Sequence, residues 1–160
     1  MARIAFITRF DTREDQIKAR EWMDMLKARG NTVDLYEHPK RFIKAYKKQP
    51  WPDLILTEVD FGIIHDGLLV NVSSILEQEV LQSIPVIAFS DYNYEEQNFS
   101  RRCLQEKDAG RLIYVYMKKS LYYKDGFQKK ILPEVDKICP SVPVDKRAEA
   151  ARRFFARHNK

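Results

Sequence analysis

Short apolar runs bounded by turn residues recur along the chain and predict strands that are buried on both faces. The clearest run is 54–56, which follows a Pro-Asp pair and is succeeded by the acidic residues Glu58 and Asp60. A run that is apolar on both faces and too short for a helix is typical of a parallel sheet covered by helices. Similar runs predict four further strands, at 3–8, 32–36, 85–90 and 112–117.

Between these runs, apolar residues recur at helical spacing. In the first such segment, Asp11 and Glu14 form a capping-box pattern, and Ile17, Trp22 and Leu26 recur among polar residues. Further helices are predicted over 39–48, over 68–82, in the segment ending at 110, and over 121–138. The stretch 60–67 contains two glycines and turn residues, which predict a loop.

Five strands alternating with five helices predict an α/β fold, a (βα)5 doubly wound domain with one parallel five-stranded sheet. Right-handed crossovers place helices on both faces of such a sheet. The segment 140–143 begins and ends with proline and predicts a rigid break, after which 145–157 has the pattern of an extra C-terminal helix. We therefore expect a domain over 1–140 and a helical extension over 141–160.

Charge separates these two regions. The net charge is +5, and the extension carries six lysines and arginines against two acids, so that 1–140 is nearly neutral. A basic extension can approach nucleic acid or an acidic partner, although a charged helix face is more often only solvated. The residues that would contact nucleic acid are basic, namely Arg147, Arg152, Arg153 and Arg157.

Composition narrows the class of protein. The chain has 160 residues, of which 44% are hydrophobic and 32% charged, as in a globular domain. Cys103 and Cys139 are far apart in sequence, and no histidine lies at ligand spacing, which predicts unpaired thiols in a reducing cytoplasm and no metal site. Residues 1–8 resemble a first strand rather than a signal peptide, and no glycine-rich phosphate loop predicts a nucleotide cofactor.

Polar side chains follow four of the predicted strands. They are Thr8 and Arg9, Glu58, Ser90 and Asp91, and Lys118 and Lys119. Because parallel strands gather their carboxyl ends at one edge of the sheet, we expect these residues to meet there.

In this order and spacing the chain resembles the receiver domain of two-component response regulators, a flavodoxin-like and CheY-like fold. The stretch from Pro52 to Glu58 is similar to that family's Pro-Asp-Leu-x-x-x-Asp, whose final aspartate accepts a phosphoryl group. The resemblance implies that Ser90 and Tyr116 correspond to the switch residues, and that Lys119 corresponds to the family's lysine. It covers residues 1 to about 138.

The departures from the family pattern concern the metal. The family binds a divalent cation through two acids after the first strand, and the matching residues here are Thr8 and Arg9. A hydroxyl and a fixed cation are poor substitutes for charged oxygen ligands of Mg²⁺. Glu58 is one methylene longer than aspartate, and near Arg9 and Lys119 it would already be a paired anion. We therefore expect a pseudo-receiver that is not an enzyme, needs no cofactor, and signals through protein contacts.

The resemblance also implies an interaction surface on the fourth helix, fifth strand and fifth helix. Exposed tyrosine and arginine are common anchors of such surfaces. The candidates are Phe99, Arg101, Arg102, Tyr114, Tyr122 and Tyr123. A protein partner is expected there, and a homodimer is one form that it could take.

Other interpretations stay open. Glu58 could be an ordinary ion-pair partner, and Ser90 and Tyr116 ordinary strand-end residues. Asp60 could accept a phosphoryl group if the register slipped by two residues. A small flavodoxin-like enzyme could use Asp11, Asp60 or His65, and this predicts a closed apolar pocket at the strand ends.

Overall fold

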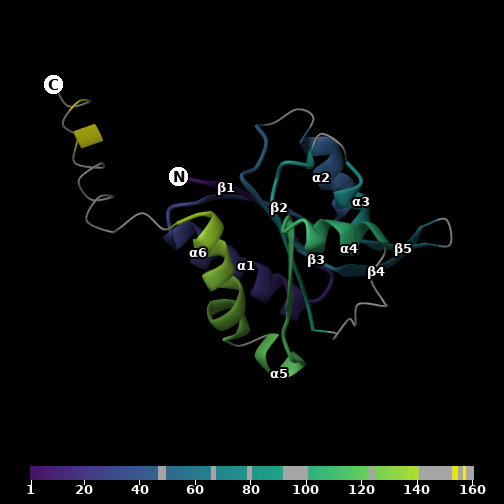
Figure 1. The fold of residues 1–160 in the computed structure, drawn as a ribbon. Helices are drawn as coiled ribbons and strands as arrows, with labels where there is room; N and C mark the ends of the chain where they lie inside the picture. Colours follow the sequence, from purple (N-terminus) through teal and green to yellow (C-terminus); the bar gives the residue numbers. More distant parts are fainter. Residues whose placement is uncertain are drawn as a thin grey trace.

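Five parallel strands form one sheet in the order β2-β1-β3-β6-β7 (Figure 1). The computed structural model describes residues 1–46, 50–65, 68–78, 81–91, 101–122 and 125–140, together with 153, 154 and 157. The strands of the sheet are β1 (Arg3–Ile7), β2 (Thr32–Tyr36), β3 (Leu54–Glu58), β6 (Val86–Ser90) and β7 (Leu112–Tyr116). The predicted doubly wound α/β fold is therefore confirmed.

Helices cover both faces of this sheet because its strands are apolar on both faces. On one face lie α1 (Arg13–Ala28), α5 (Lys119–Tyr122), the wide turn η3 (Phe127–Ile131) and α6 (Leu132–Ile138). On the other lie α2 (Pro39–Ala45), α3 (Ser73–Leu76) and α4 (Arg101–Asp108). Alternate strand residues supply the two cores: Phe6 points toward α1, and Ile7 points toward α2 and α3.

Helix α1 begins one residue later than the sequence pattern predicts. Its N-cap is Thr12, whose side chain accepts a hydrogen bond from the backbone N–H of Asp15 at 3.1 Å. The buried stripe is Asp15, Lys18, Ala19, Trp22 and Leu26, so Ile17 is left 46% exposed. The expected apolar stripe was wrong at Ile17 because two charged side chains belong to the buried face.

The stretch after β3 was predicted incorrectly. Instead of a loop followed by a helix from residue 68, β4 (Asp60–His65) and β5 (Leu68–Asn71) form an antiparallel hairpin. The helix is reduced to α3, which starts at Ser73. The two residues between the strands are Asp66 and Gly67, a dipeptide typical of hairpin connections, and this local signal prevails over the helical spacing of the leucines that follow.

The last predicted helix is divided. The chain forms the short α5, and then η3, in which the backbone N–H of Leu132 donates to the carbonyl of Phe127, before α6. Pro133 has no N–H for the regular ladder, which favours a wide turn before it. Gly126 is needed at the bend, because a Cβ there would collide with the Leu121 carbonyl oxygen and the Met117 sulfur.

The C-terminal extension falls mostly outside the described residues, so its expected helix and its separation from 1–140 stay predictions. Arg153, Phe154 and Arg157 are described, and all three are exposed. Both cysteines are buried and unpaired. In the part of the chain that the structure describes, none of the helices has the length and apolar character needed to cross a membrane.

Candidate functional site

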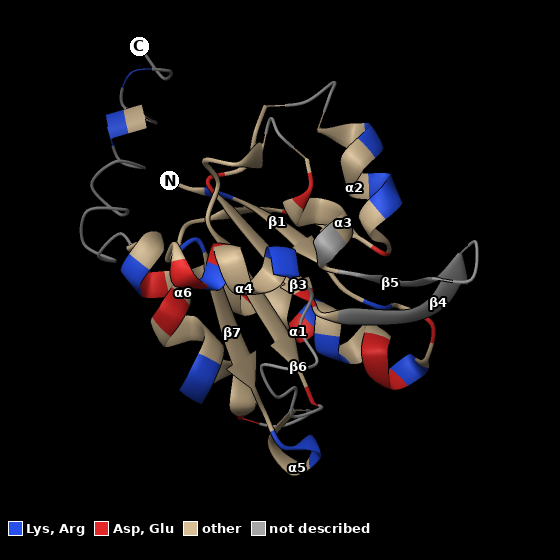
Figure 2. Cartoon of the chain, turned by 45° about the vertical axis from the view of Figure 1, so that its right-hand side comes forward, with Lys and Arg blue, Asp and Glu red and all other residues tan. Residues whose placement is uncertain are grey.

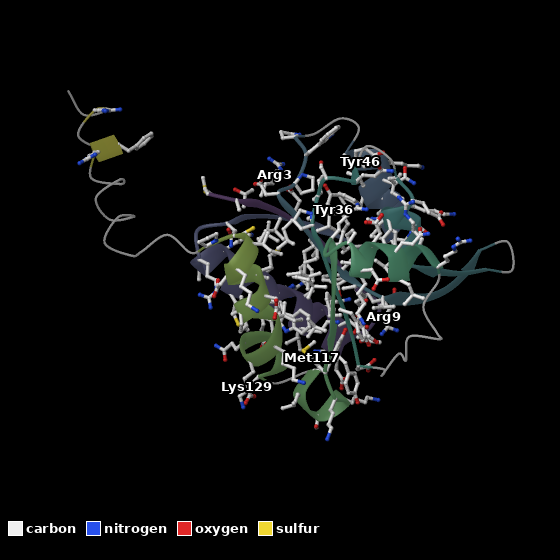
Figure 3. All side chains as sticks on the ribbon, viewed as in Figure 1. Arg3, Arg9, Tyr36, Tyr46, Met117 and Lys129 are labelled. Carbon is white, nitrogen blue, oxygen red and sulfur yellow. The ribbon has the colours of Figure 1, made fainter. Side chains whose placement is uncertain are left out.

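The polar residues that follow the parallel strands share one edge of the sheet, as expected. Thr8 and Arg9 follow β1, Glu58 ends β3, Ser90 ends β6, and Lys118 follows β7. In Figure 3, Arg9 and Met117 lie toward the same side of the molecule, whereas Arg3, at the start of β1, lies toward the opposite side. The edge therefore presents residues from four strands in one place.

Glu58 is the centre of this edge. The residue is 2% exposed, and both of its carboxylate oxygens are engaged. The backbone N–H of Arg9 donates to Oε2 at 2.7 Å, and the Arg9 guanidinium lies 3.4 Å from the same atom. Oε1 accepts a hydrogen bond from the hydroxyl of Tyr122 at 2.5 Å and lies 3.2 Å from the ammonium of Lys18. Glu58 is therefore a buried anion with two cations beside it.

Lys18 brings its charge to this anion from helix α1. Its Nζ donates to the Tyr122 hydroxyl at 2.9 Å and lies 3.8 Å from Asp15 Oδ1. Three aromatic rings surround it, with centroids 4.5 Å (Tyr122), 5.3 Å (Trp22) and 6.0 Å (Phe89) from Nζ. Carboxylates, a hydroxyl and ring faces together compensate for the desolvation of a buried ammonium.

The expected ion pair between Glu58 and Lys119 is replaced by the pair with Lys18. Lys119 is exposed at the start of α5 and forms no ion pair with Glu58 among the described residues. The expected pair with Arg9 is present. The sequence did contain a signal for Lys18, since it lies three residues after Asp15 and four before Trp22 on one helix face.

The other strand-end residues are less directly connected to Glu58. Thr8 is fully buried, and its Oγ1 has no hydrogen-bond partner within the described part of the chain. Ser90 is buried, and its carbonyl accepts from the N–H of Met117 at 3.0 Å. Tyr116 is half-buried, and its carbonyl accepts from Lys130 at 3.3 Å. The roles that the resemblance implies for Ser90, Tyr116 and Lys119 stay predictions.

Electrostatics keep Arg9 charged and Tyr122 neutral. Burial lowers the pKa of Arg9, but the nearby anion Glu58, with smaller effects from Tyr122, Asp15 and Asp91, gives a net rise. Burial raises the pKa of Tyr122 well above its ordinary value, and the charge of Glu58 and the hydrogen bond to it raise it further. The Tyr122 hydroxyl therefore remains a donor to Glu58 throughout the neutral range.

This raised pKa predicts an alkaline loss of stability. Below the pKa of an unfolded tyrosine, about 10, Tyr122 is protonated in both states and its contribution is complete. Above it the unfolded chain ionises first, so the free energy of unfolding should fall by up to about 1.4 kcal/mol per pH unit. Urea unfolding between about pH 9 and pH 11 measures this loss.

The variant Tyr122→Phe is the control, because it keeps the ring and removes the titrating group. We expect its stability to fall less steeply over the same range. The comparison is needed since burial and Asp34 also raise the pKa of Tyr36, which both proteins retain. Equal slopes for the two proteins would contradict the assignment.

The residues around Glu58 do not fit a divalent cation. Mg²⁺ prefers several anionic or carbonyl oxygens, whereas Glu58 is bound by a guanidinium, an ammonium and a tyrosine hydroxyl. No group of three or more His, Cys, Asp or Glu side chains gathers among the described residues.

A surface hollow of about 250 Å³ opens on α1, lined by Glu14, Ile17, Lys18, Glu21 and Trp22.

The expected interaction surface is only partly as predicted. Tyr122 is 1% exposed and belongs to the Glu58 site, so its interpretation as an exposed anchor was wrong. Arg101 is exposed, Arg102 pairs with Glu106 at 3.2 Å, and Tyr114 is half-buried. Phe99 and Tyr123 lie outside the described residues.

Other candidates cannot be placed in the site. The backbone of Asp60 and His65 belongs to the β4 hairpin, and their side chains lie outside the described part. Among the basic residues of the extension, Arg147 and Arg152 are not described either, so nucleic-acid binding remains a prediction, as does a homodimer. Asp11 is exposed and makes no contact with Glu58.

No protein-family model matches the chain, and no curated protein does. Solved structures do. The chain is similar to the N-terminal domain of a response regulator/sensory box/GGDEF three-domain protein from Carboxydothermus hydrogenoformans, with 15% identity, a TM-score of 0.55 and 99% coverage of both chains. It is also similar to a two-component response regulator from Clostridium difficile, with 18% identity, a TM-score of 0.52, and coverage of 85% of this chain and 99% of that one.

A third similar structure is the N-terminal domain of a response regulator receiver protein from Methanoculleus marisnigri JR1. The identity is 11%, the TM-score is 0.53, and 89% of this chain and 99% of that chain are covered. At these identities the likeness establishes the fold, and the chemistry has to be argued from the side chains.

Proposed function

We propose, from the premise that this chain has the fold of a receiver domain, that it is a signalling module that works without phosphorylation. It is a pseudo-receiver whose central carboxylate is neutralised by its own side chains. It acts by contact with a protein partner and catalyses no reaction. The observation that carries this proposal is the ammonium of Lys18, 3.2 Å from Glu58 Oε1.

Phosphoryl transfer to a carboxylate needs a free oxygen that can approach phosphorus in line. Glu58 Oε1 is held by Lys18 and Tyr122, and Oε2 by Arg9. The residue is also buried, so an incoming phosphoryl donor would have to displace at least one of these contacts. Catalytic geometry tolerates only small displacements of the nucleophile, which argues against transfer to Glu58.

The space at the strand ends favours a module without enzyme activity. A flavodoxin-like enzyme predicts a closed apolar pocket there. The side chains of Lys18 and Tyr122 fill the space beside Glu58, and the hollow of about 250 Å³ is an open one along α1, with Lys18 and Trp22 in its wall, rather than a closed apolar pocket. These observations favour a binding module over a small-molecule enzyme.

Charge suggests where the partner binds and what kind of surface it has. The described residues of α4, β7, α5 and η3, over 101–122 and 125–131, carry eight lysines and arginines against three acids. Figure 2 shows basic segments on α4 and α5. We propose that this side, called the basic side below, meets an acidic protein surface, with attraction that speeds association at low salt.

Incubation with acetyl phosphate and Mg²⁺, followed by intact-mass measurement, tests the proposal. The mass should not change, whereas an active receiver treated in parallel should gain one phosphoryl group. A gain by this chain would overturn the pseudo-receiver. The variant Asp60→Asn then tells which acid accepts the phosphoryl group. The gain in mass would disappear if Asp60 were the acceptor and would persist if Glu58 were.

A further inference from the structure

We infer that Lys18, Glu58 and Tyr122 form a latch that holds helix α5 against the end of the sheet without any chemical signal. The inference rests on the proposed function, since it names what sets the geometry of the basic side in a module that is not phosphorylated. The three residues come from α1, β3 and α5. Each of them contacts both of the others within 3.2 Å.

Among the described residues, few contacts other than this cluster hold helix α5 in place. It comprises only Lys119–Tyr122, and its buried residue is Tyr122. A four-residue helix is not stable alone and takes its position from tertiary packing. Lys119 and Ser120 are exposed and Leu121 is only half-buried, so the side chain of Tyr122 is the anchor of the helix.

The ring and the hydroxyl of Tyr122 hold helix α5 in different ways. The ring of Tyr122 packs edge-on against Trp22, with centroids 5.6 Å apart, and lies 6.3 Å from Phe89. This packing holds the ring in the core, but the direction in which α5 leaves the core is fixed by the hydroxyl, which donates to Glu58 and accepts from Lys18. Hydrogen bonds that involve charged groups are the stronger kind.

Helix α5 lies within the basic side, so the latch links the buried carboxylate to the surface proposed for the partner. A partner that recognises the latched position of α5 would bind the resting protein directly. By linkage, such a partner would stabilise the cluster by as much as the cluster favours partner binding. The latch thus provides a constitutive binding state, with no chemical step before recognition.

Hydrogen exchange of the 160-residue chain tests the latch. In Tyr122→Phe, which keeps the ring, the segment 118–122 should exchange about tenfold faster than in the wild type at its two hydrogen-bonded amides, those of Leu121 and Tyr122, which both donate to the Lys118 carbonyl. This is the change expected for the loss of a charge-assisted hydrogen bond. The matched control is Tyr46→Phe, since Tyr46 is also buried and its hydroxyl contacts Gln78 at 3.4 Å on the opposite face. This control should leave 118–122 unchanged.

Glu58→Gln is the second variant, which keeps an acceptor for Tyr122 but removes its charge. It should also speed exchange in 118–122, less than Tyr122→Phe does. Unchanged exchange in Tyr122→Phe would overturn the latch, and so would an increase that is equal in 118–122 and in β1. The mass test of phosphorylation is separate: a gain of a phosphoryl group would refute the proposed function while the exchange result still decides whether the latch exists.

Discussion

Replacing Lys18 with methionine is expected to destabilise the fold by about 3–5 kcal/mol. The change keeps most of the apolar stem and removes the ammonium. Among the described residues, Glu58 would then keep Arg9 and Tyr122 as partners. Asp15, which is 6% exposed, would lose the cation 3.8 Å away. Removing a nearby cation from two buried carboxylates is costly, and chemical denaturation at neutral pH measures the loss of stability.

Two comparisons make this prediction specific. Lys27→Met, on the same helix but exposed, should change stability by no more than about 0.5 kcal/mol. The double variant Lys18→Met with Glu58→Gln should be less destabilised than the sum of the single variants, because it removes both charges together. Strict additivity, or a loss for Lys18→Met as small as that for Lys27→Met, would show that the pair is not energetically coupled.

Truncating Trp22 to alanine should cost about 3–5 kcal/mol. Trp22 is 1% exposed and stacks on Phe127, with centroids 4.6 Å apart, and on Phe6 at 6.1 Å. Its ring also lies beside the ammonium of Lys18. The substitution would therefore open a cavity where α1, β1 and η3 meet and would remove part of the environment of the buried charge. Thermal or denaturant unfolding measures the effect.

Trp51→Ala provides the matched control, because Trp51 is 53% exposed. Surface substitutions of this kind usually change stability by about 0.5 kcal/mol or less. A comparable loss for both tryptophans would contradict the packing described here. A loss for Trp22→Ala together with faster exchange in 118–122 would further support the dependence of α5 on this corner of the core.

The sheet could be predicted from sequence because its signals are local. The runs 54–56 and 85–90 are apolar on both faces, and this pattern alone fixes a strand that helices cover. The hairpin was missed because Leu68, Leu69, Val72 and Ile75 also fit a helical period. The division of the last helix was missed because η3 depends on the combination of Gly126 and Pro133 rather than on the apolar pattern.

The site was predicted in its location but not in its full composition. Glu58 and Arg9 follow strands, so topology brings them together. Lys18 lies inside a helix, and its position depends on how α1 is rotated about its axis. A hydrophobic pattern treats every lysine as outward-facing. The predicted helix therefore placed Ile17 on the buried face, where the structure has Lys18. The buried carboxylate of Glu58 needs a cation beside it, and this explains why a charged residue occupies the inner face.

The ammonium of Lys18 is covalently attached to the chain, so its presence beside Glu58 does not depend on the concentration of an ion in solution. The Lys18 charge is present once in every folded molecule, and its stem fixes it near Glu58 at an effective concentration that free ions in solution do not approach. Chelating agents and changes in free magnesium should therefore leave the centre of this protein unaltered. The amount of protein able to bind a partner would then depend on how much of the protein the cell contains and not on the concentration of free divalent ions.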